Sequence, residues 1–189
     1  MDRGARLSAE DWADAALVAL RSRGPGGVAV EPLAKALGAT KGSFYWHYRN
    51  REALLHAALG HWETQETDAV ISEAERGGAP SQKLHRLFAI ILQDAGRNPG
   101  LLVALDEPVV MHAVARVSGR RVDYVLGLLV EGGVPPAEAS RRAHLLFAMV
   151  LGLDGLAATM ADRMPSDADR HAWVRSAVSM AFGQRPASD

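Results

Sequence analysis

Glycine and proline divide this chain of 189 residues into segments of helical length. Within these segments, apolar residues recur at the spacing of amphipathic helices, and no stretch alternates with period two for long enough to indicate a strand. The sequence therefore predicts an all-α protein of about nine helices. We expect them at about 9–22, 31–37, 40–48, 51–76, 81–98, 101–105, 109–131, 136–161 and 168–182.

The amino-acid composition excludes several classes of protein. The chain has no cysteine, which excludes disulfides, thiolate catalysis and cysteine zinc sites and fits a reducing compartment. Its N-terminal residues lack the apolar core of a signal peptide, and the most apolar tract, Leu145 to Ala161, is interrupted by Asp154. A spanning helix needs about 20 apolar residues. We therefore expect a cytoplasmic protein with no membrane partner.

Charge is distributed unevenly along the chain. The formal net charge is −1, but residues 1–60 carry +2 and residues 61–189 carry −3. The basic surplus thus lies in the N-terminal third, and it is small.

Residues 31–48 predict a helix-turn-helix. Glu31 to Leu37 forms a short helix with Pro32 in its first turn, Gly38 ends it, and Thr40 is placed to cap a second short helix that ends at Tyr48. Two short helices joined by a three-residue turn have the layout of a DNA-binding helix-turn-helix.

The second short helix is unusually aromatic, with the sequence KGSFYWHY over residues 41–48. At 100° per residue, Phe44 and Tyr48 share one side and can pack on the preceding helix, while Trp46 lies opposite them. One alternative is that all four aromatic side chains are core residues. Their angular spread argues against this, because four adjacent large side chains cannot all face one core.

The outward face of this helix has the chemistry of a DNA major-groove reader. Gly42 would allow close backbone approach, Ser43 can hydrogen-bond a base edge, and Trp46 can contact a thymine methyl or a sugar. Further residues are placed to reach phosphates. These phosphate candidates are Thr40, Lys41, Tyr45, His47 and, in the next helix, Arg51.

The stretch VEPLAKALGATKGSFYWHYRNREALL, residues 30–55, resembles the DNA-binding signature of the TetR (tetracycline repressor) family of transcriptional regulators. The resemblance implies a homodimer that binds double-stranded operator DNA through residues 1–50 and binds an inducer and its second copy through residues 51–189. It places DNA contacts at Thr40, Lys41, Gly42, Ser43, Tyr45, Trp46, His47 and Arg51. Glu31 lies where several members read a base, but a carboxylate there repels phosphate and can only accept from a cytosine amine.

A heptad-like seam on the helix from Pro136 predicts a dimer interface. Its apolar residues are spaced alternately by four and three positions, and the last helix is a natural partner. Packing inside one monomer is the alternative explanation. The predicted interface consists of Ala143, Leu146, Val150, Leu153, Ala157, Trp173, Ala177, Met180 and Ala181.

Apolar residues of the C-terminal helices are candidates for binding a small, largely apolar inducer, although we expect most of them to be ordinary core residues. The predicted pocket residues are Leu87, Phe88, Ile91, Met111, Val114, Tyr124, Leu128, Phe147 and Leu151.

Other functional classes receive less support from the sequence. Nucleotide-binding loops, a nucleophile elbow and metal-spaced histidine pairs are missing, so we expect no enzyme activity, no metal and no cofactor. The TetR resemblance implies a ligand-responsive repressor that a small-molecule inducer releases from a palindromic operator. A TetR-like transcriptional activator, or a helical protein-interaction adaptor without a ligand, remains the alternative.

Overall fold

A computed structural model describes residues 7–94, 107–166 and 168–183, and these residues form helices and turns without a strand. The predicted all-α class is therefore confirmed for this part of the chain. The expected helix at 101–105 lies outside the described residues. Among the helices that are described, none is both long and apolar enough to cross a membrane.

The chain folds into two compact units. Unit 1 contains the residues up to Gln65 together with Asn98–Ala115, and unit 2 contains Glu66–Arg97 and Arg116–Asp189. The two units are defined by packing alone. The predicted division into a DNA-binding part, residues 1–50, and an inducer-binding and dimerisation part, residues 51–189, stays a prediction.

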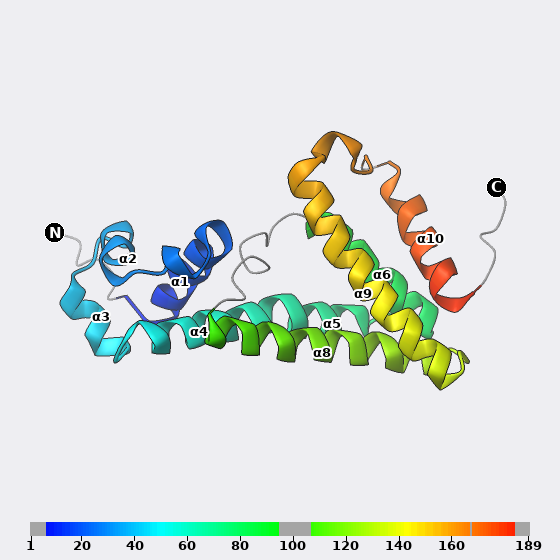
Figure 1. The fold of residues 1–189 in the computed structure, drawn as a ribbon, viewed down its shortest axis with the longest axis horizontal. Helices are drawn as coiled ribbons and strands as arrows, with labels where there is room; N and C mark the ends of the chain where they lie inside the picture. The colour runs from blue at the N-terminus through cyan, green and yellow to red at the C-terminus, as the bar shows by residue number, and fades with distance from the viewer. Residues whose placement is uncertain (1–6, 95–106, 167, 184–189) are drawn as a thin grey trace. The chain divides into compact units, whose positions relative to one another are not determined.

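Unit 1 is formed by the first four helices and the start of α8. The helices are α1 (Ala9–Arg23), α2 (Val30–Ala36), α3 (Lys41–His47) and α4 (Arg51–Glu63), with a 3-10 turn at Pro25–Gly27 (Figure 1). α1 packs against α4, and α2 packs against α3.

Side-chain caps fix the starts of α1 and α4 in unit 1. Ser8 and Asp11 form a capping box at the start of α1, with the Ser8 backbone N–H donating to Asp11 Oδ2 at 2.7 Å. Asn50 accepts a hydrogen bond from the backbone N–H of Ala53 at 2.8 Å and caps α4.

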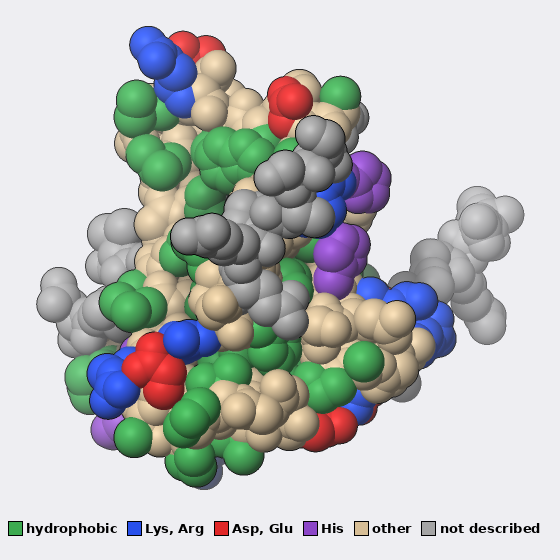
Figure 2. Space-filling model, turned by 90° about the vertical axis from the view of Figure 1, so that its right-hand side faces the viewer, with side chains coloured by type: hydrophobic (Ala, Val, Ile, Leu, Met, Phe, Trp, Pro, Cys, Tyr) green, Lys and Arg blue, Asp and Glu red, His purple; other side chains and the backbone are tan. Residues whose placement is uncertain are grey.

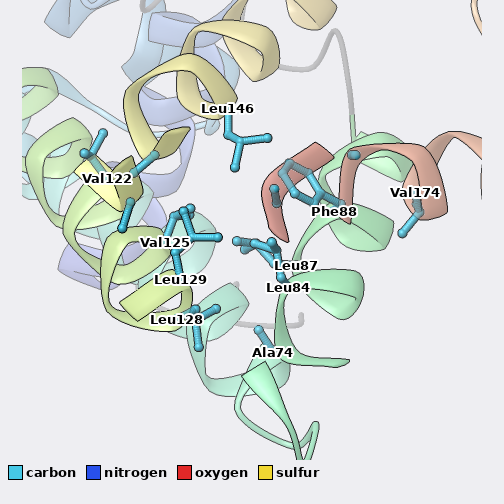
Figure 3. Packing of buried hydrophobic residues seen from close by; sticks show 14 of the residues in the cluster. Ala74, Leu84, Leu87, Phe88, Val122, Val125, Leu128, Leu129, Leu146 and Val174 are labelled. Atoms are coloured by element: carbon cyan, nitrogen blue, oxygen red, sulfur yellow. The ribbon is translucent and has the colours of Figure 1, made fainter. Parts of the chain in front are cut away.

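Unit 2 is formed by the remaining helices. They are α5 (Ala69–Ala74), α6 (Pro80–Asp94), α8 (Pro108–Glu131, from Arg116 onward in this unit), α9 (Pro136–Thr159) and α10 (Arg170–Phe182). α6 packs against both α5 and α10. In Figure 3, Leu84 and Leu87 of α6 point toward Val125 and Leu129 of α8, and Leu146 of α9 lies above them.

The predicted long helix after Asn50 is interrupted by a π-helical turn at Thr64–Asp68. A π turn pairs backbone groups five residues apart instead of four, which locally widens the helix. Here the Arg121 guanidinium donates to Glu66 O at 3.2 Å and to Thr67 Oγ1 at 3.0 Å. Thr67 is buried, with 1% of its surface exposed, so the bond to Arg121 satisfies a hydroxyl that water does not reach.

Candidate DNA-binding site

The turn between α2 and α3 has the geometry that the sequence predicts. Gly38 has φ of 63°, in the left-handed region that glycine adopts without steric cost. The backbone N–H of Ala39 donates to Ala34 O at 2.8 Å, and the Thr40 hydroxyl accepts from the backbone N–H of Ser43 at 3.2 Å. Thr40 thus caps α3, as expected.

One face of α3 is held in the core of unit 1 by aromatic contacts. Phe44 is fully buried, and its ring meets Trp12 edge-to-face at 5.4 Å between ring centroids and stacks on Tyr48 at 6.0 Å. The Tyr48 hydroxyl donates to the backbone O of Ala9 at 2.7 Å. This face of α3 is therefore fixed to α1.

The opposite face of α3 is open to solvent. Trp46 is 78% exposed and Tyr45 is 55% exposed. Gly42 is exposed as well, while Ser43 and His47 are half-buried. An indole that its own unit leaves mostly uncovered is available to a partner.

Lys41 forms an ion pair that the sequence did not indicate. Its ammonium donates to Glu31 Oε1 at 3.0 Å, and both side chains are exposed. The hydrogen bond from Lys41 to the Glu31 carboxylate holds the pKa of Lys41 above its ordinary value, so the lysine stays charged. Residues on two different helices make this contact, so no local spacing could have revealed it.

Arg51 has internal partners in unit 1. Its guanidinium donates to both carboxylate oxygens of Glu107, at 2.7 and 3.2 Å, and to the backbone oxygens of Val28 and Pro25, at 2.7 and 2.6 Å. The sequence placed Arg51 among the phosphate candidates and gave no sign of these partners, because Glu107 lies 56 positions further along the chain.

Residues 13–58, which include α2, α3 and most of α1 and α4, match the family model of bacterial regulatory proteins of the tetR family. The chain has the DNA-binding segment and the fold of TetR-family regulators. The predicted resemblance is thereby confirmed, and the match extends beyond residues 30–55 on both sides. No curated protein gives a significant sequence match.

Solved structures of transcriptional regulators share the fold over nearly the whole chain. A transcriptional regulator from Rhodococcus sp. Rha1 is 23% identical, with a TM-score of 0.72 over 94% of this chain and 95% of its own. A TetR transcriptional regulator from Legionella pneumophila is 17% identical, with a TM-score of 0.74 over 94% and 98%. A regulator from Saccharomonospora viridis in complex with choline is 16% identical, with a TM-score of 0.71 over 89% and 93%.

In this TetR-like fold, the predicted inducer-binding residues do not all lie in one unit. Leu87, Phe88 and Leu128 are buried in the core of unit 2, and Ile91, Tyr124 and Phe147 pack against that core. Leu151, on α9, is half-buried. Met111 and Val114 belong to unit 1.

Tyr124 brings a polar group to the edge of the unit 2 core. Its hydroxyl donates to Glu75 Oε1 at 2.8 Å, and the other Glu75 oxygen accepts from the Lys83 ammonium at 2.7 Å. Burial and the bond to Glu75 hold the pKa of Tyr124 above its ordinary value, so the phenol remains a donor.

The predicted dimer residues fall into two groups. Ala143, Leu146, Leu153, Ala177 and Ala181 are buried inside unit 2, and Val150 packs against its core. Trp173 and Met180 are 40% and 59% exposed, and Ala157 is half-buried. The heptad spacing on α9 thus largely marks core packing within one chain, the alternative that the sequence left open.

The described residues also carry no metal cluster: across 7–94, 107–166 and 168–183, no three His, Asp or Glu side chains are placed to hold a metal ion.

Proposed function

We propose that this protein is a ligand-responsive, sequence-specific transcriptional regulator that binds palindromic operator DNA as a homodimer in the cytoplasm. It acts as a repressor that a small, largely apolar inducer releases from the operator. The recognition helix is α3, with Thr40, Lys41, Gly42, Ser43, Tyr45, Trp46 and His47 as the DNA contacts.

The exposed face of α3 is the observation that carries this proposal. Trp46 and Tyr45 project from a helix whose other face is fixed by Phe44, so the protein presents aromatic side chains rigidly to a partner. The major groove admits one helix, and side chains on the exposed face reach base edges there. Lys41 and His47 on its flanks are suited to the phosphates.

Homodimer formation is supported by apolar side chains that unit 2 leaves exposed on α9 and α10. Leu145 is 71% exposed, Leu156 is 45% exposed, and Trp173 and Met180 add apolar surface on α10. Figure 2 views the molecule from the side on which α10 lies and shows hydrophobic side chains reaching the surface between charged ones. We therefore assign Leu145 and Leu156 to the interface together with Trp173 and Met180, in place of the buried residues of the heptad seam.

An inducer site in unit 2 is supported by the apolar cluster around Phe88 and Leu128, with the Tyr124 hydroxyl at its edge. Pockets for small ligands combine an apolar lining with a few fixed polar groups. The regulator from Saccharomonospora viridis with this fold was solved with choline, which shows that one member of the fold holds a small ligand.

Selection from a random duplex pool at near-physiological salt tests the DNA-binding proposal, because low salt would reward any basic surface. We expect enrichment of an inverted repeat whose half-sites are about one helical turn, roughly 34 Å, apart. A pool without enrichment, from protein freed of bound small molecules by refolding, would contradict the proposal and favour a protein-interaction adaptor.

Alanine variants of α3 test the contact residues on the enriched duplex. Trp46→Ala should lower affinity by about tenfold or more, since burying a large apolar side chain is worth about 1.5–3 kcal/mol. Val18→Ala is the matched control, because Val18 is 64% exposed on α1, outside the recognition helix. Equal affinities for the two variants would remove Trp46 from the interface.

A further inference from the structure

We infer that Arg51 and Glu107 form a latch that positions the helix-turn-helix for DNA, and that Arg51 is a positioning residue instead of a phosphate contact. This inference rests on the proposed DNA-binding function. It departs from the sequence-based prediction, which grouped Arg51 with the residues that touch DNA.

The guanidinium of Arg51 is already occupied inside unit 1. An arginine has five N–H groups. Arg51 makes four hydrogen bonds within the unit: Nε to Val28 O, Nη1 to Glu107 Oε1, and Nη2 to both Pro25 O and Glu107 Oε2. Its positive charge is also offset by the Glu107 carboxylate. Little hydrogen-bonding capacity or net charge remains for a phosphate.

The two backbone carbonyls that Arg51 holds lie immediately before the helix-turn-helix. Pro25 begins the 3-10 turn, and Val28 is fully buried two residues before the start of α2 at Val30. The turn is otherwise closed by short backbone bonds, including Val28 N–H to Pro25 O at 3.0 Å. By holding these carbonyls, Arg51 fixes the position of the chain just before α2, and therefore where α2 and α3 begin.

Glu107 connects this point to another part of the chain. It directly precedes α8, which begins at Pro108 and continues as one helix to Glu131. Arg51 therefore joins the start of α4, the turn before α2 and the start of α8. A two-oxygen contact between an arginine and a carboxylate defines orientation as well as distance, so the latch specifies one arrangement of these three segments.

The salt dependence of DNA binding separates a positioning residue from a phosphate contact. Each phosphate contact contributes about 0.9 to the slope of log affinity against log salt. We expect Arg51→Gln and Arg51→Lys to weaken binding of the enriched duplex by about tenfold, or about 1.4 kcal/mol, at every salt concentration and to leave the slope unchanged. A slope reduced by about one in Arg51→Gln, the variant that loses the positive charge, would overturn the latch.

For Glu107→Gln, the two explanations predict opposite changes in DNA affinity. If the carboxylate acts only through its charge, its removal strengthens DNA binding, because one negative charge is lost from the protein. If it holds Arg51, its removal weakens binding as Arg51→Lys does. Glu52→Gln is the matched control, since Glu52 is an exposed acid on α4 beside Arg51. Tighter binding by both glutamine variants would contradict the latch.

Amide hydrogen exchange tests the latch without DNA. In the full-length protein, Arg51→Lys and Glu107→Gln should speed exchange at Gly27, Val28 and Ala29, and Glu52→Gln should not. Unchanged exchange at these amides in both latch variants would overturn the inference even if wild-type protein binds no duplex. Failure of the wild type to bind DNA, with faster exchange in the latch variants, would contradict only the proposed function.

Discussion

Nearby side chains of α3 meet opposite environments. Phe44 is fully buried against Trp12 and Tyr48, whereas Trp46, two positions later, is 78% exposed. The helical rotation of 100° per residue accounts for the difference, since two steps turn the side chain by about 200°. A single short helix can therefore be anchored and still present an aromatic surface.

Gly42 belongs to this exposed surface and gives a prediction at the residue scale. A Cβ built at Gly42 would meet only the Thr40 hydroxyl, at 3.6 Å, so the fold itself accepts alanine. We expect Gly42→Ala to leave stability unchanged or raise it by up to about 1 kcal/mol, because alanine favours helices. The added methyl should reduce operator affinity by about tenfold if DNA approaches the backbone here.

Thermal denaturation and fluorescence anisotropy on the enriched duplex measure these two effects of Gly42→Ala. Gly60→Ala is the control, because Gly60 is also exposed on a helix and a Cβ there would have no neighbour within 4 Å. Wild-type affinity for Gly42→Ala would show that DNA does not come close to this position.

Side chains define the starts of three helices in this chain and support one π turn. Ser8, Thr40 and Asn50 cap α1, α3 and α4 by accepting hydrogen bonds from backbone N–H groups. The π turn at Thr64–Asp68 depends instead on Arg121, which comes from a different helix. The capping residues lie within a few positions of the groups they bind, whereas Arg121 lies 54 positions from Thr67.

The capping box of α1 predicts a dependence of stability on pH. Hydrogen bonds from the backbone N–H and hydroxyl of Ser8 hold the pKa of Asp11 below its ordinary value of 3.8. A lowered folded-state pKa contributes stability above the unfolded pKa, and this contribution is lost as pH falls through the folded pKa. Urea denaturation should therefore show Asp11→Ala less stable than wild type at pH 7, with the difference shrinking below about pH 4. A difference that is equal at pH 7 and pH 3 would contradict this role for Asp11.

The π turn gives a second prediction at this scale. Thr67→Val keeps the shape of the buried side chain and removes the oxygen that accepts from Arg121 Nε. We expect a loss of about 1–3 kcal/mol in the free energy of unfolding, because the half-buried guanidinium of Arg121 loses an acceptor for its Nε–H. Chemical denaturation measures this loss, and amide exchange at residues 64–68 should speed up. Thr159→Val is the control, since the Thr159 hydroxyl donates to Gly155 O within its own helix and the residue is exposed.

At the scale of the whole molecule, two compact units carry different kinds of surface. Unit 1 exposes aromatic side chains on α3, and unit 2 exposes apolar side chains on α9 and α10. Contiguous exposed apolar surface on a folded protein commonly marks an interface. A homodimer would cover the apolar surface of unit 2 and supply two copies of α3 to successive half-sites.

Leu145→Glu tests this arrangement. Leu145 is 71% exposed in the single chain, so the substitution should leave the monomer folded but place an unpaired charge in the proposed interface. We expect a dimer for the wild type and a monomer for Leu145→Glu by light scattering, with operator affinity reduced at least tenfold. Val18→Glu, at a similarly exposed apolar site on α1, should remain dimeric. A dimeric Leu145→Glu variant would place the interface elsewhere.

Local sequence determined the helices, their caps and the two faces of α3, because helical period, capping and glycine turns act over a few residues. It also carried the family resemblance, since the residues of the helix-turn-helix are contiguous. Tertiary structure alone decided that Arg51 binds Glu107, that Glu31 binds Lys41 and that Arg121 supports a π turn. It also turned most of the heptad seam on α9 into the core of unit 2. The physical reason is the same in each case. The spacing of apolar or charged residues determines which face of a helix is apolar or charged. Packing between segments distant in sequence determines what that face contacts.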